Sequence, residues 1–517
     1  MKYPIGIQNF ESLREDGYVY VDKTERIHQL VTNGKYYFLS RPRRFGKSLL
    51  VSTLRAYFEG KKELFDGLAM ARLEREWRVH PVLHLDLNSG QYDSIEALNE
   101  KLTHNLSGWE NTWGLKADAG LSISSRFENV IRAACKQSEQ KVVILVDEYD
   151  KPLLAAIDNP ELQSSFRSML KAFYGNLKSC DEYIRFALLT GVTKFSHVSI
   201  FSDLNNLTDI SLDGRYDDLC GITSEELHHC FAPDIQALAD KEGVTSDEMM
   251  NQLRQMYDGY HFSKEMTADM YNPFSLLNAL NSHNIDNYWF STGTPTFLIK
   301  LLQQYDYPLQ QFSTGDVTVK TLSSKESVTD EPLALFYQTG YLTIKGYDRE
   351  FGSYRLGFPN REVEESFLNF LLPRYVGGTE NRSSFFIENF VRDLRKGDIN
   401  GFMERMKSFF ADTPYELIKD VENHYQNVMF TICRLMGYYT VAEYRTSRGR
   451  IDMVVKASDY NYVFEFKFDK SAKDALGQID TKEYLLPFAT EGKQLIKVGV
   501  NFSKETRNID DYCYLEA

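Results

Sequence analysis

The chain has 517 residues, a formal net charge of −14 at pH 7, 43% apolar residues and 14% aromatic residues. A chain of this length is too long for one hydrophobic core, and this apolar content excludes a disordered protein. The acidic balance argues against a protein that coats nucleic acid over its whole surface.

The sequence predicts a cytoplasmic protein without a membrane contact. No stretch approaches the roughly 18 uninterrupted apolar residues of a membrane span, and residues 1–6 lack the apolar core of a signal peptide. The cysteines stand singly and form no Cys-x-x-Cys pair, so we expect neither a zinc site nor a disulfide framework. They lie at positions 135, 180, 220, 230, 433 and 513.

The first predicted elements lie ahead of the main core. Aromatic and β-branched residues in Tyr18–Thr24 favour a strand, and a helix is expected from Asp22 to Leu30. Because this segment precedes the first core strand, we expect it to cover the base of a nucleotide bound at the loop that follows.

A phosphate-binding loop is predicted to end at Gly46-Lys47-Ser48. The apolar run 36–39 leads into it, and a helical pattern follows over 49–58. In such a loop, Gly46 lets the backbone approach a phosphate and Lys47 reaches the β- and γ-phosphates. The Ser48 hydroxyl would contact Mg²⁺. The sequence therefore predicts strand, phosphate loop and helix.

One position departs from the usual phosphate-loop motif, because Arg41 stands where the first glycine is expected. Arg43 and Arg44 lie inside the loop and are candidates for extra contacts to phosphate or to another domain. Residues 1–78 carry 15 Lys and Arg against 10 Asp and Glu. A bound nucleotide explains this local positive charge more simply than a nucleic-acid path does.

Two acids follow a second core strand. The apolar run 142–146 is typical of a strand buried on both faces of a parallel sheet, and it ends at Asp147 and Glu148. We expect Asp147 to hold Mg²⁺ through water and Glu148 to polarise the attacking water. The alternative is that both acids only mark the solvent end of the strand, but the upstream loop favours the functional interpretation.

A third strand is predicted at 186–191, where Thr190 is a candidate sensor of the γ-phosphate. A plain strand-capping role for Thr190 is an equal alternative. With a strand at 82–87 and a helix at 94–106, the alternation of strands and helices predicts an α/β fold. The sheet would be parallel, with helices on both faces.

The middle of the chain changes character. Helical segments in 192–280 predict a lid, with Ser224 as the N-cap of one of its helices. In 281–400, a helix at 333–341 and a hairpin at 342–357 predict a small winged-helix-like region. Nothing basic lines its helices, so a connector is favoured over a reader of DNA.

A second constellation lies near the C-terminus. Asp452 falls in one predicted strand, and Glu465 and Lys467 share one face of the next. If these strands pair antiparallel, both carboxylates meet beside one lysine, which is costly unless a divalent metal lies between them. Such a metal would hold a scissile phosphate and activate water that Lys467 orients. The alternative is an amphipathic hairpin with a wet Glu/Lys face.

Both ends of the chain resemble known families. The N-terminal part resembles the AAA-ATPase-like family of P-loop proteins found in many bacteria, in which an arginine also replaces the first glycine of the loop. The matching segments are 20–24, 41–48, 147–152 and 189–196. The C-terminal part resembles the associated PD-(D/E)XK nuclease-superfamily domain. It matches at Glu422, Gly449–Asp452, Glu465–Lys467, Gln478 and Tyr484.

The resemblance implies an AAA-ATPase-like P-loop domain with lid over 1–280, a connector over 281–400 and a nuclease-like domain over 401–517. In that domain Asp452 and Glu465 would bind metal and Lys467 would assist catalysis. Glu422 would be a further acid. The pattern of residues 475–479 with Tyr484 separately predicts a helix over this site.

We therefore expect a protein that binds ATP and Mg²⁺, hydrolyses ATP, and is coupled to a Mg²⁺- or Mn²⁺-dependent nuclease. DNA is the first expectation for its substrate and RNA the alternative, and an oligomer is compatible with the sequence. The competing hypothesis is a nucleotide-switched signalling or binding protein whose nuclease-like domain only holds nucleic acid or a partner. A scaffold with two inert sites is least favoured, because all the acids and both lysines are present.

Overall fold

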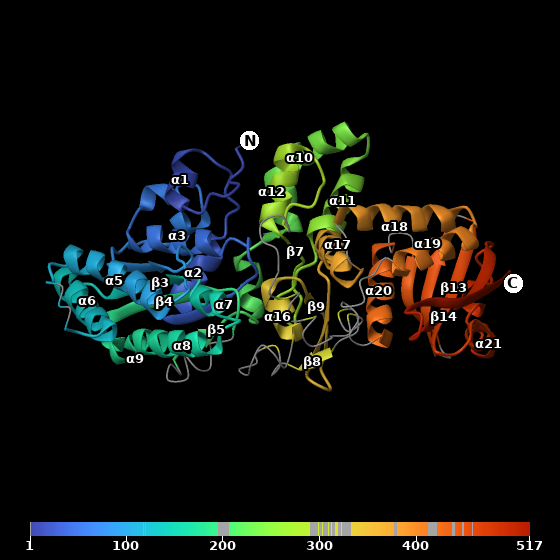
Figure 1. The fold of residues 1–517 in the computed structure, drawn as a ribbon. Helices are drawn as coiled ribbons and strands as arrows, with labels where there is room; N and C mark the ends of the chain where they lie inside the picture. Colours follow the sequence, from blue (N-terminus) through green and yellow to red (C-terminus); the bar gives the residue numbers. More distant parts are fainter. Residues whose placement is uncertain are drawn as a thin grey trace. The chain divides into compact units, whose positions relative to one another are not determined.

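The chain forms two compact units in a computed structural model (Figure 1). The N-terminal unit comprises 1–293 with 314–362, and the C-terminal unit comprises 294–313 with 363–517. The domain boundaries expected at 280 and 400 stay predictions. The structure describes residues 2–116, 118, 120–194, 206–289, 298, 302, 309, 312, 316–318, 322, 332–376, 380–411, 421–436, 440–446, 449–457 and 459–516.

The N-terminal unit is built on a five-stranded parallel sheet with the spatial order β2-β3-β4-β1-β5. This confirms the expected α/β fold, and it places β4 between β1 and β3. The strands are β1 (Tyr36–Ser40), β2 (Val82–Asp86), β3 (Val142–Asp147), β4 (Ile184–Gly191) and β5 (Thr208–Asp209).

Helices cover both faces of this sheet, as its buried strands require. Every residue of β1 and β3 is buried, which matches apolar runs without polar alternation. Alternate residues of β3 pack with α5 (Ile95–Thr112), α6 (Ile123–Ser138) and α8 (Pro160–Tyr174). Helix α3 (Lys47–Phe58) contacts the sheet from the opposite side, whereas α8 lies below the strands in Figure 1.

The segment ahead of β1 contains two helices, α1 (Phe10–Glu15) and α2 (Thr24–Asn33), and the predicted strand over Tyr18–Thr24 is wrong. Asp22 accepts hydrogen bonds from the backbone N–H and the hydroxyl of Thr24, at 2.8 and 2.6 Å, which fixes the start of α2. Val19 and Val21 pack against the lid helices instead of entering a sheet. Tertiary packing thus overrides strand propensity here.

The lid consists of α10 (Ser224–Glu242), α11 (Ser246–Tyr257) and α12 (Pro273–Ser282), and a short antiparallel pair joins β6 (Ile222–Thr223) to β7 (Met270–Tyr271). The N-cap of α10 is Thr223 rather than the predicted Ser224. The Thr223 hydroxyl accepts from the Glu226 N–H at 3.2 Å, and Glu226 accepts from the Thr223 N–H at 2.8 Å. This reciprocal capping box satisfies two backbone donors and moves the cap by one residue.

The winged-helix-like region is also present in the N-terminal unit. Helix α16 (Pro332–Thr339) precedes an antiparallel hairpin of β9 (Thr343–Asp348) and β10 (Ser353–Gly357), and β8 (Asp316–Thr318) pairs with β10. Three short helices complete the description of this unit, namely α4 (Ala69–Leu73), α7 (Lys151–Ala155) and α9 (Asn176–Ser179).

The C-terminal unit contains a mixed five-stranded sheet in the order β11-β12-β13-β14-β15. Strands β13 and β14 run parallel through the crossover helix α21 (Ala472–Thr481), and the other neighbouring pairs are antiparallel. Tyr484 lies beyond the end of α21, not on it as predicted. The strands are β11 (Thr440–Thr446), β12 (Gly449–Lys456), β13 (Tyr460–Phe468), β14 (Gln494–Ser503) and β15 (Asn508–Glu516).

Four helices precede this sheet in the chain. They are α17 (Arg361–Val376), α18 (Glu380–Arg395), α19 (Ile399–Ala411) and α20 (Val421–Leu435). Within the described part of the chain, no helix combines the length and apolarity needed to cross a membrane.

Candidate functional site

The phosphate loop joins the end of β1 to the start of α3. Gly46 is the N-cap of α3 and has a φ of 88°, a left-handed conformation that glycine adopts at little steric cost. The first backbone N–H groups of a helix have no partner within the helix. The loop therefore ends at a helix N-terminus that includes Lys47 and Ser48, a position whose free N–H groups are suited to an anion.

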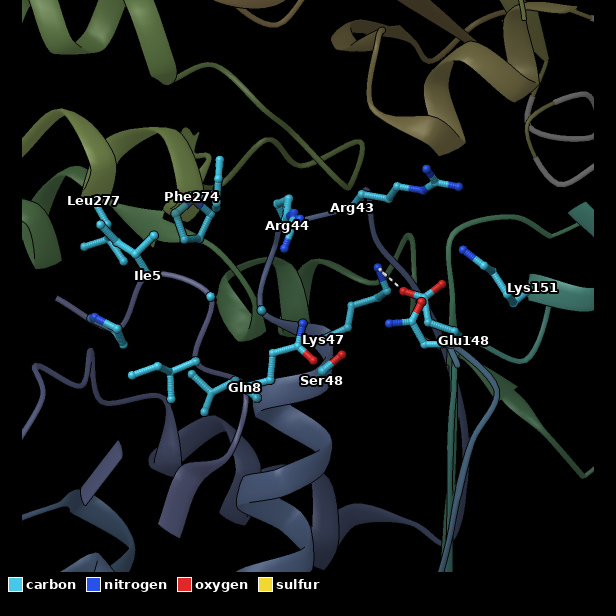
Figure 2. Close-up of a pocket in the computed structure, with 17 residues that line it drawn as sticks. Ile5, Gln8, Arg43, Arg44, Lys47, Ser48, Glu148, Lys151, Phe274 and Leu277 are labelled. Carbon is cyan, nitrogen blue, oxygen red and sulfur yellow. Dashed lines mark ion pairs between the residues drawn. The ribbon is translucent and has the colours of Figure 1, made fainter. Parts of the chain in front are cut away.

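The Lys47 ammonium is held inside the site. It donates to the carbonyl oxygens of Arg41 and Pro42, at 3.0 and 3.1 Å, and lies 3.4 Å from the Glu148 carboxylate. Figure 2 shows this ion pair across the cavity. The Lys47 side chain is only 3% exposed, and a buried cation needs such acceptors to offset its lost hydration. The loop lysine and the acid after β3 therefore line the same cavity, and their roles toward phosphate and water stay predictions.

Arg41, at the position of the missing glycine, is buried and has a structural role. Its guanidinium donates to the carbonyl oxygens of Ser40, Ser211 and Tyr216 at distances of 3.0, 2.9 and 3.0 Å. It also lies 4.1 Å from the centre of the Phe262 ring. Burial lowers the pKa of this guanidinium. The arginine thus ties the loop to two later segments, which a glycine has no side chain to do.

The end of β4 supports the acid at the end of β3. The Thr190 hydroxyl donates to Asp147 at 2.5 Å, and both side chains are buried. This contact follows from the strand order, because β4 lies beside β3. Contact of Thr190 with a γ-phosphate, and of Asp147 and Ser48 with Mg²⁺, stay predictions.

The turn after β3 is fixed by two side chains that point into the protein. The Tyr149 hydroxyl donates to the Thr193 carbonyl at 2.8 Å. Asp150 accepts from the backbone N–H groups of Val192 and Thr193 at 3.1 and 2.6 Å, and from the Thr193 hydroxyl at 2.6 Å. Burial raises the pKa of Asp150 to about 6. With these two residues buried, Glu148 and Lys151 on either side of them line the cavity.

The cavity at the loop has a volume of about 310 Å³. Among the described residues that line it, four carry positive charge and one is a carboxylate. Figure 2 shows Ile5, Phe274 and Leu277 at one end and Glu148 with Lys151 at the other. The charged lining residues are Arg43, Arg44, Lys47, Lys151 and Glu148. An apolar end and several cations along the rest of the cavity suit the base and the phosphates of a nucleoside phosphate.

Some lining residues were not identified from the sequence. Lys151 and Asn88 border the phosphate loop, and Pro273, Phe274 and Leu277 come from α12. Lys151 lies within segment 147–152 of the family resemblance, which was the one sequence feature that could have indicated a role in the site. The α12 residues are more than 200 positions from the loop, and only tertiary packing brings them there.

A second layer of contacts holds the loop from behind. The Trp289 indole N–H donates to the Arg43 carbonyl at 3.3 Å. Glu362 accepts from the backbone N–H groups of Tyr288 and Trp289 at 2.6 and 2.8 Å. Glu362 is fully buried, and burial raises its pKa to about 7. The Arg44 guanidinium lies 5.0 Å from the Phe274 ring, so Arg43 and Arg44 both connect the loop to later segments.

The second candidate site lies on β12 and β13. These strands pair antiparallel with Met453 opposite Phe464, and the next residues are Asp452 and Glu465. The Phe466 N–H donates to Asp452 at 2.9 Å across the strands. The structure therefore brings the two predicted carboxylates onto neighbouring strands.

Lys467 joins this acidic pair and helix α21. Its ammonium donates to Glu465 at 2.9 Å and to the side-chain oxygen of Gln478 at 2.6 Å. Glu465 is 2% exposed and the Lys467 side chain 16% exposed. Two carboxylates are the hard oxygen ligands that Mg²⁺ and Mn²⁺ prefer, so Asp452 and Glu465 fit a divalent metal by donor type.

The predicted acid Glu422 belongs to α20, but its side chain is outside what the structure describes. Within the described residues, no cluster of three or more His, Cys, Asp or Glu side chains has the geometry of a metal site. Asp452 and Glu465 as metal ligands, and Lys467 as a catalytic group, stay predictions.

Comparison with known families matches both ends of the chain. Residues 4–201 match a model described as a predicted AAA-ATPase. Residues 420–512 match a model of the PD-(D/E)XK nuclease superfamily.

One relative matches over almost the whole chain. An uncharacterized protein in the vnfD 5' region of Azotobacter chroococcum mcd 1 is 38% identical over 526 residues, covering 98% of this chain and 98% of that protein.

Two solved structures share weaker similarity. The Aeropyrum pernix ORC1 protein in complex with DNA is 10% identical, with 67% of this chain and 92% of that chain covered and a TM-score of 0.24. Cdc6p from Pyrobaculum aerophilum is 11% identical, with 66% and 89% covered and the same TM-score of 0.24. Scores of this size support no argument about function.

Replacing Arg41 by the usual glycine should weaken the fold. Arg41→Gly removes the donor to three buried carbonyls, and an unsatisfied buried group costs about 1–3 kcal/mol. We expect the free energy of unfolding of the N-terminal unit to fall by about 3 kcal/mol in urea denaturation. Arg43→Gly, the same change at an exposed position, should cost less than about 1 kcal/mol. Equal losses in the two variants would contradict the structural role of Arg41.

The buried Glu362 should make stability depend on pH. Its folded pKa of about 7 lies above the usual 4.5, so its protonated form stabilises the fold. That stability is fully present below pH 4.5 and is lost as the pH rises through 7. Between pH 5 and pH 8, we expect the wild type to lose about 2–3 kcal/mol relative to Glu362→Gln. Urea denaturation at both pH values tests this, and a pH-independent difference would contradict it.

Proposed function

The chain belongs to the family of predicted AAA-ATPases and ends in a PD-(D/E)XK nuclease-superfamily domain, and from this premise we propose a nucleotide-controlled nuclease. In this proposal the N-terminal unit binds ATP with Mg²⁺ and hydrolyses it. The C-terminal unit cleaves phosphodiester bonds of nucleic acid with Mg²⁺ or Mn²⁺, with DNA as the first candidate substrate. The nucleotide bound at the first site controls the second.

The observation that carries the ATPase proposal is the placement of Lys47. Its ammonium is shared by two loop carbonyls and Glu148 inside a cavity rich in positive charge. A triphosphate is a stronger acceptor than backbone carbonyls and would draw Lys47 toward itself. Glu148 would then lose its ion pair and be able to accept a proton from the attacking water.

The two ends of the cavity support a particular orientation of the nucleotide. The base would lie toward Ile5, Phe274 and Leu277, and the phosphates toward Lys47 and Ser48. A smaller apolar cavity of about 100 Å³ shares Gly46, Leu49 and Leu277 among its lining residues. The N-terminal segment would thus cover the base, as the sequence predicted.

The nuclease proposal rests on three side chains from two neighbouring strands. Asp452 and Glu465 would hold the divalent metal, which when bound would activate water and stabilise charge on the phosphate. Lys467 would position the water, and Gln478 fixes the Lys467 ammonium from α21. Because Gln478 and Glu465 both accept from Lys467, the ammonium is oriented before any substrate arrives.

Contacts of α16 support control by nucleotide. The backbone N–H of Lys194, just after β4, donates to Gln338 at 2.8 Å. At Gly340, a Cβ atom would lie 2.6 Å from the Cβ of Pro42 in the phosphate loop. One helix end therefore touches both the loop and the segment after Thr190. Rearrangement of either segment by a nucleotide would displace α16, which the β9–β10 hairpin connects in the chain to Val363, where the longer stretch of the C-terminal unit begins.

Two substitutions test the ATPase. Lys47→Ala should weaken ATP binding by about 10–100-fold, since charge-assisted contacts contribute about 1.5–3 kcal/mol. Glu148→Gln should retain ATP binding and slow hydrolysis by at least about 100-fold. Fluorescent ATP titration and phosphate release measure the two effects, with Lys136→Ala on the exposed surface of α6 as control. Hydrolysis at the wild-type rate in Glu148→Gln would contradict the role of Glu148.

Two further substitutions test the nuclease. Glu465→Gln and Lys467→Ala should each slow Mg²⁺- or Mn²⁺-dependent DNA cleavage by at least about 100-fold and leave ATP hydrolysis unchanged. Glu465→Gln should also abolish the thermal stabilisation that Mn²⁺ gives to the C-terminal unit. Lys470→Ala, an exposed lysine three residues further on, is the matched control. Wild-type protein that hydrolyses ATP but cleaves neither DNA nor RNA with any metal would refute the nuclease and favour a nucleotide-switched binding protein.

A further inference from the structure

A lysine outside the usual phosphate-loop motif lines the cavity beside Glu148. Lys151 is half-buried and opens α7 directly after the turn that follows β3. Its ammonium makes no ion pair or side-chain hydrogen bond with any other residue that the structure describes. A half-buried cation inside a cavity, with no ion pair to an acid among the described residues, is suited to an anionic ligand.

The orientation of Lys151 is fixed by its neighbours in the turn. Tyr149 and Asp150 point inward and are bonded to Val192 and Thr193 at the end of β4. The Lys151 backbone N–H donates to the Glu148 carbonyl at 3.0 Å, which closes the turn. Because Tyr149 and Asp150 are held inside the protein, Glu148 and Lys151 on either side of them face the cavity.

The position of Lys151 along the cavity indicates which phosphate it would meet. The apolar end is formed by Ile5, Phe274 and Leu277, and Lys151 lies at the opposite end, with Glu148 (Figure 2). Lys47 and Ser48 lie between these ends. A nucleoside triphosphate with its base at the apolar end has its last phosphate nearest to Glu148 and Lys151.

We propose that Lys151 is a γ-phosphate ligand that makes the site distinguish a nucleoside triphosphate from a diphosphate. This inference rests on the proposed ATPase and adds a residue and a specificity to it. Lys151 donates to an oxygen that ATP has and ADP lacks, so its contribution is confined to the triphosphate. The same charge would stabilise the negative charge that develops on the transferred phosphoryl group.

The test compares ATP with ADP in variants that do not turn over ATP. In the Glu148→Gln background, Lys151→Ala should weaken ATP binding about tenfold and change ADP binding less than twofold, as measured with fluorescent nucleotides in the presence of Mg²⁺. Lys151→Arg keeps the charge and should restore most of the ATP preference. Lys136→Ala, on the exposed surface of α6, should change neither affinity.

The outcomes separate this inference from the ATPase proposal. If Glu148→Gln protein binds neither nucleotide, the ATPase proposal itself fails. If it binds both, and Lys151→Ala leaves the ATP to ADP affinity ratio unchanged, the role of Lys151 alone is overturned. An unchanged ratio includes equal losses for both nucleotides, which is what a merely structural role would produce. Lys151→Ala with native thermal unfolding and a selective loss of ATP affinity supports the inference.

Discussion

The nucleotide site depends on how one buried ammonium is shared. Lys47 is almost fully enclosed, and its charge is balanced by the Arg41 and Pro42 carbonyls and by Glu148. Losing Glu148 without a replacement would leave the buried ammonium without a counter-charge, at a cost of several kcal/mol. Lys47 therefore couples the phosphate loop to the acid after β3, and a phosphate that binds Lys47 would affect both.

Around Lys47, the site is held by contacts that do not touch a ligand. Arg41 ties the loop to Ser211 and Tyr216, while Asp150 ties the turn after β3 to the end of β4. Glu362 fixes the backbone that carries Trp289 onto the loop. Each of these three side chains is buried and bonded to backbone groups, and such contacts make a low-dielectric interior rigid. Rigid support lets Glu148 and Lys151 face the cavity without competing orientations.

The C-terminal unit also pairs an acid of its candidate site with a lysine, but in a different fold. Its lysine also lies between an acid and a neutral acceptor, because Lys467 donates to Glu465 and to Gln478. In both units a cation holds the acid whose charge the proposed chemistry needs. A phosphate or a metal that enters would take over part of that balance. If one unit controls the other, that control would act on ion pairs that an incoming phosphate or metal can displace.

The sequence predicted those features of the fold and of the sites that depend on a local residue pattern. Apolar runs at 36–39 and 142–146 marked the core strands, because a strand buried on both faces has no polar positions. The spacing of Glu465 and Lys467 placed them on one face of a strand, and the structure has them in contact. Motif chemistry selected Lys47 and Glu148, which line the same cavity.

What the sequence could not predict depends on contacts between distant segments. Tyr18–Thr24 has strand propensity, but its valines pack on the lid. The sequence marks Arg41 as a departure from the usual motif but assigns it no role, because its partners Ser211 and Tyr216 lie 170 and 175 positions further along the chain. Phe274 and Leu277 of α12 reach the cavity only through folding of the lid. The direction in which Lys151 faces depends on the burial of Tyr149 and Asp150, which the sequence does not show.

In the proposed function, a nucleotide bound at the phosphate loop controls cleavage at the C-terminal site. The most direct test measures the initial rate of DNA cleavage with Mg²⁺ or Mn²⁺ in the presence of ATP, ADP or no nucleotide. For the wild type, the rates with ATP and without nucleotide should differ by at least about tenfold, a coupling of about 1.4 kcal/mol. In Lys47→Ala this difference should vanish while cleavage without nucleotide persists. Equal wild-type rates under all three conditions would contradict the account.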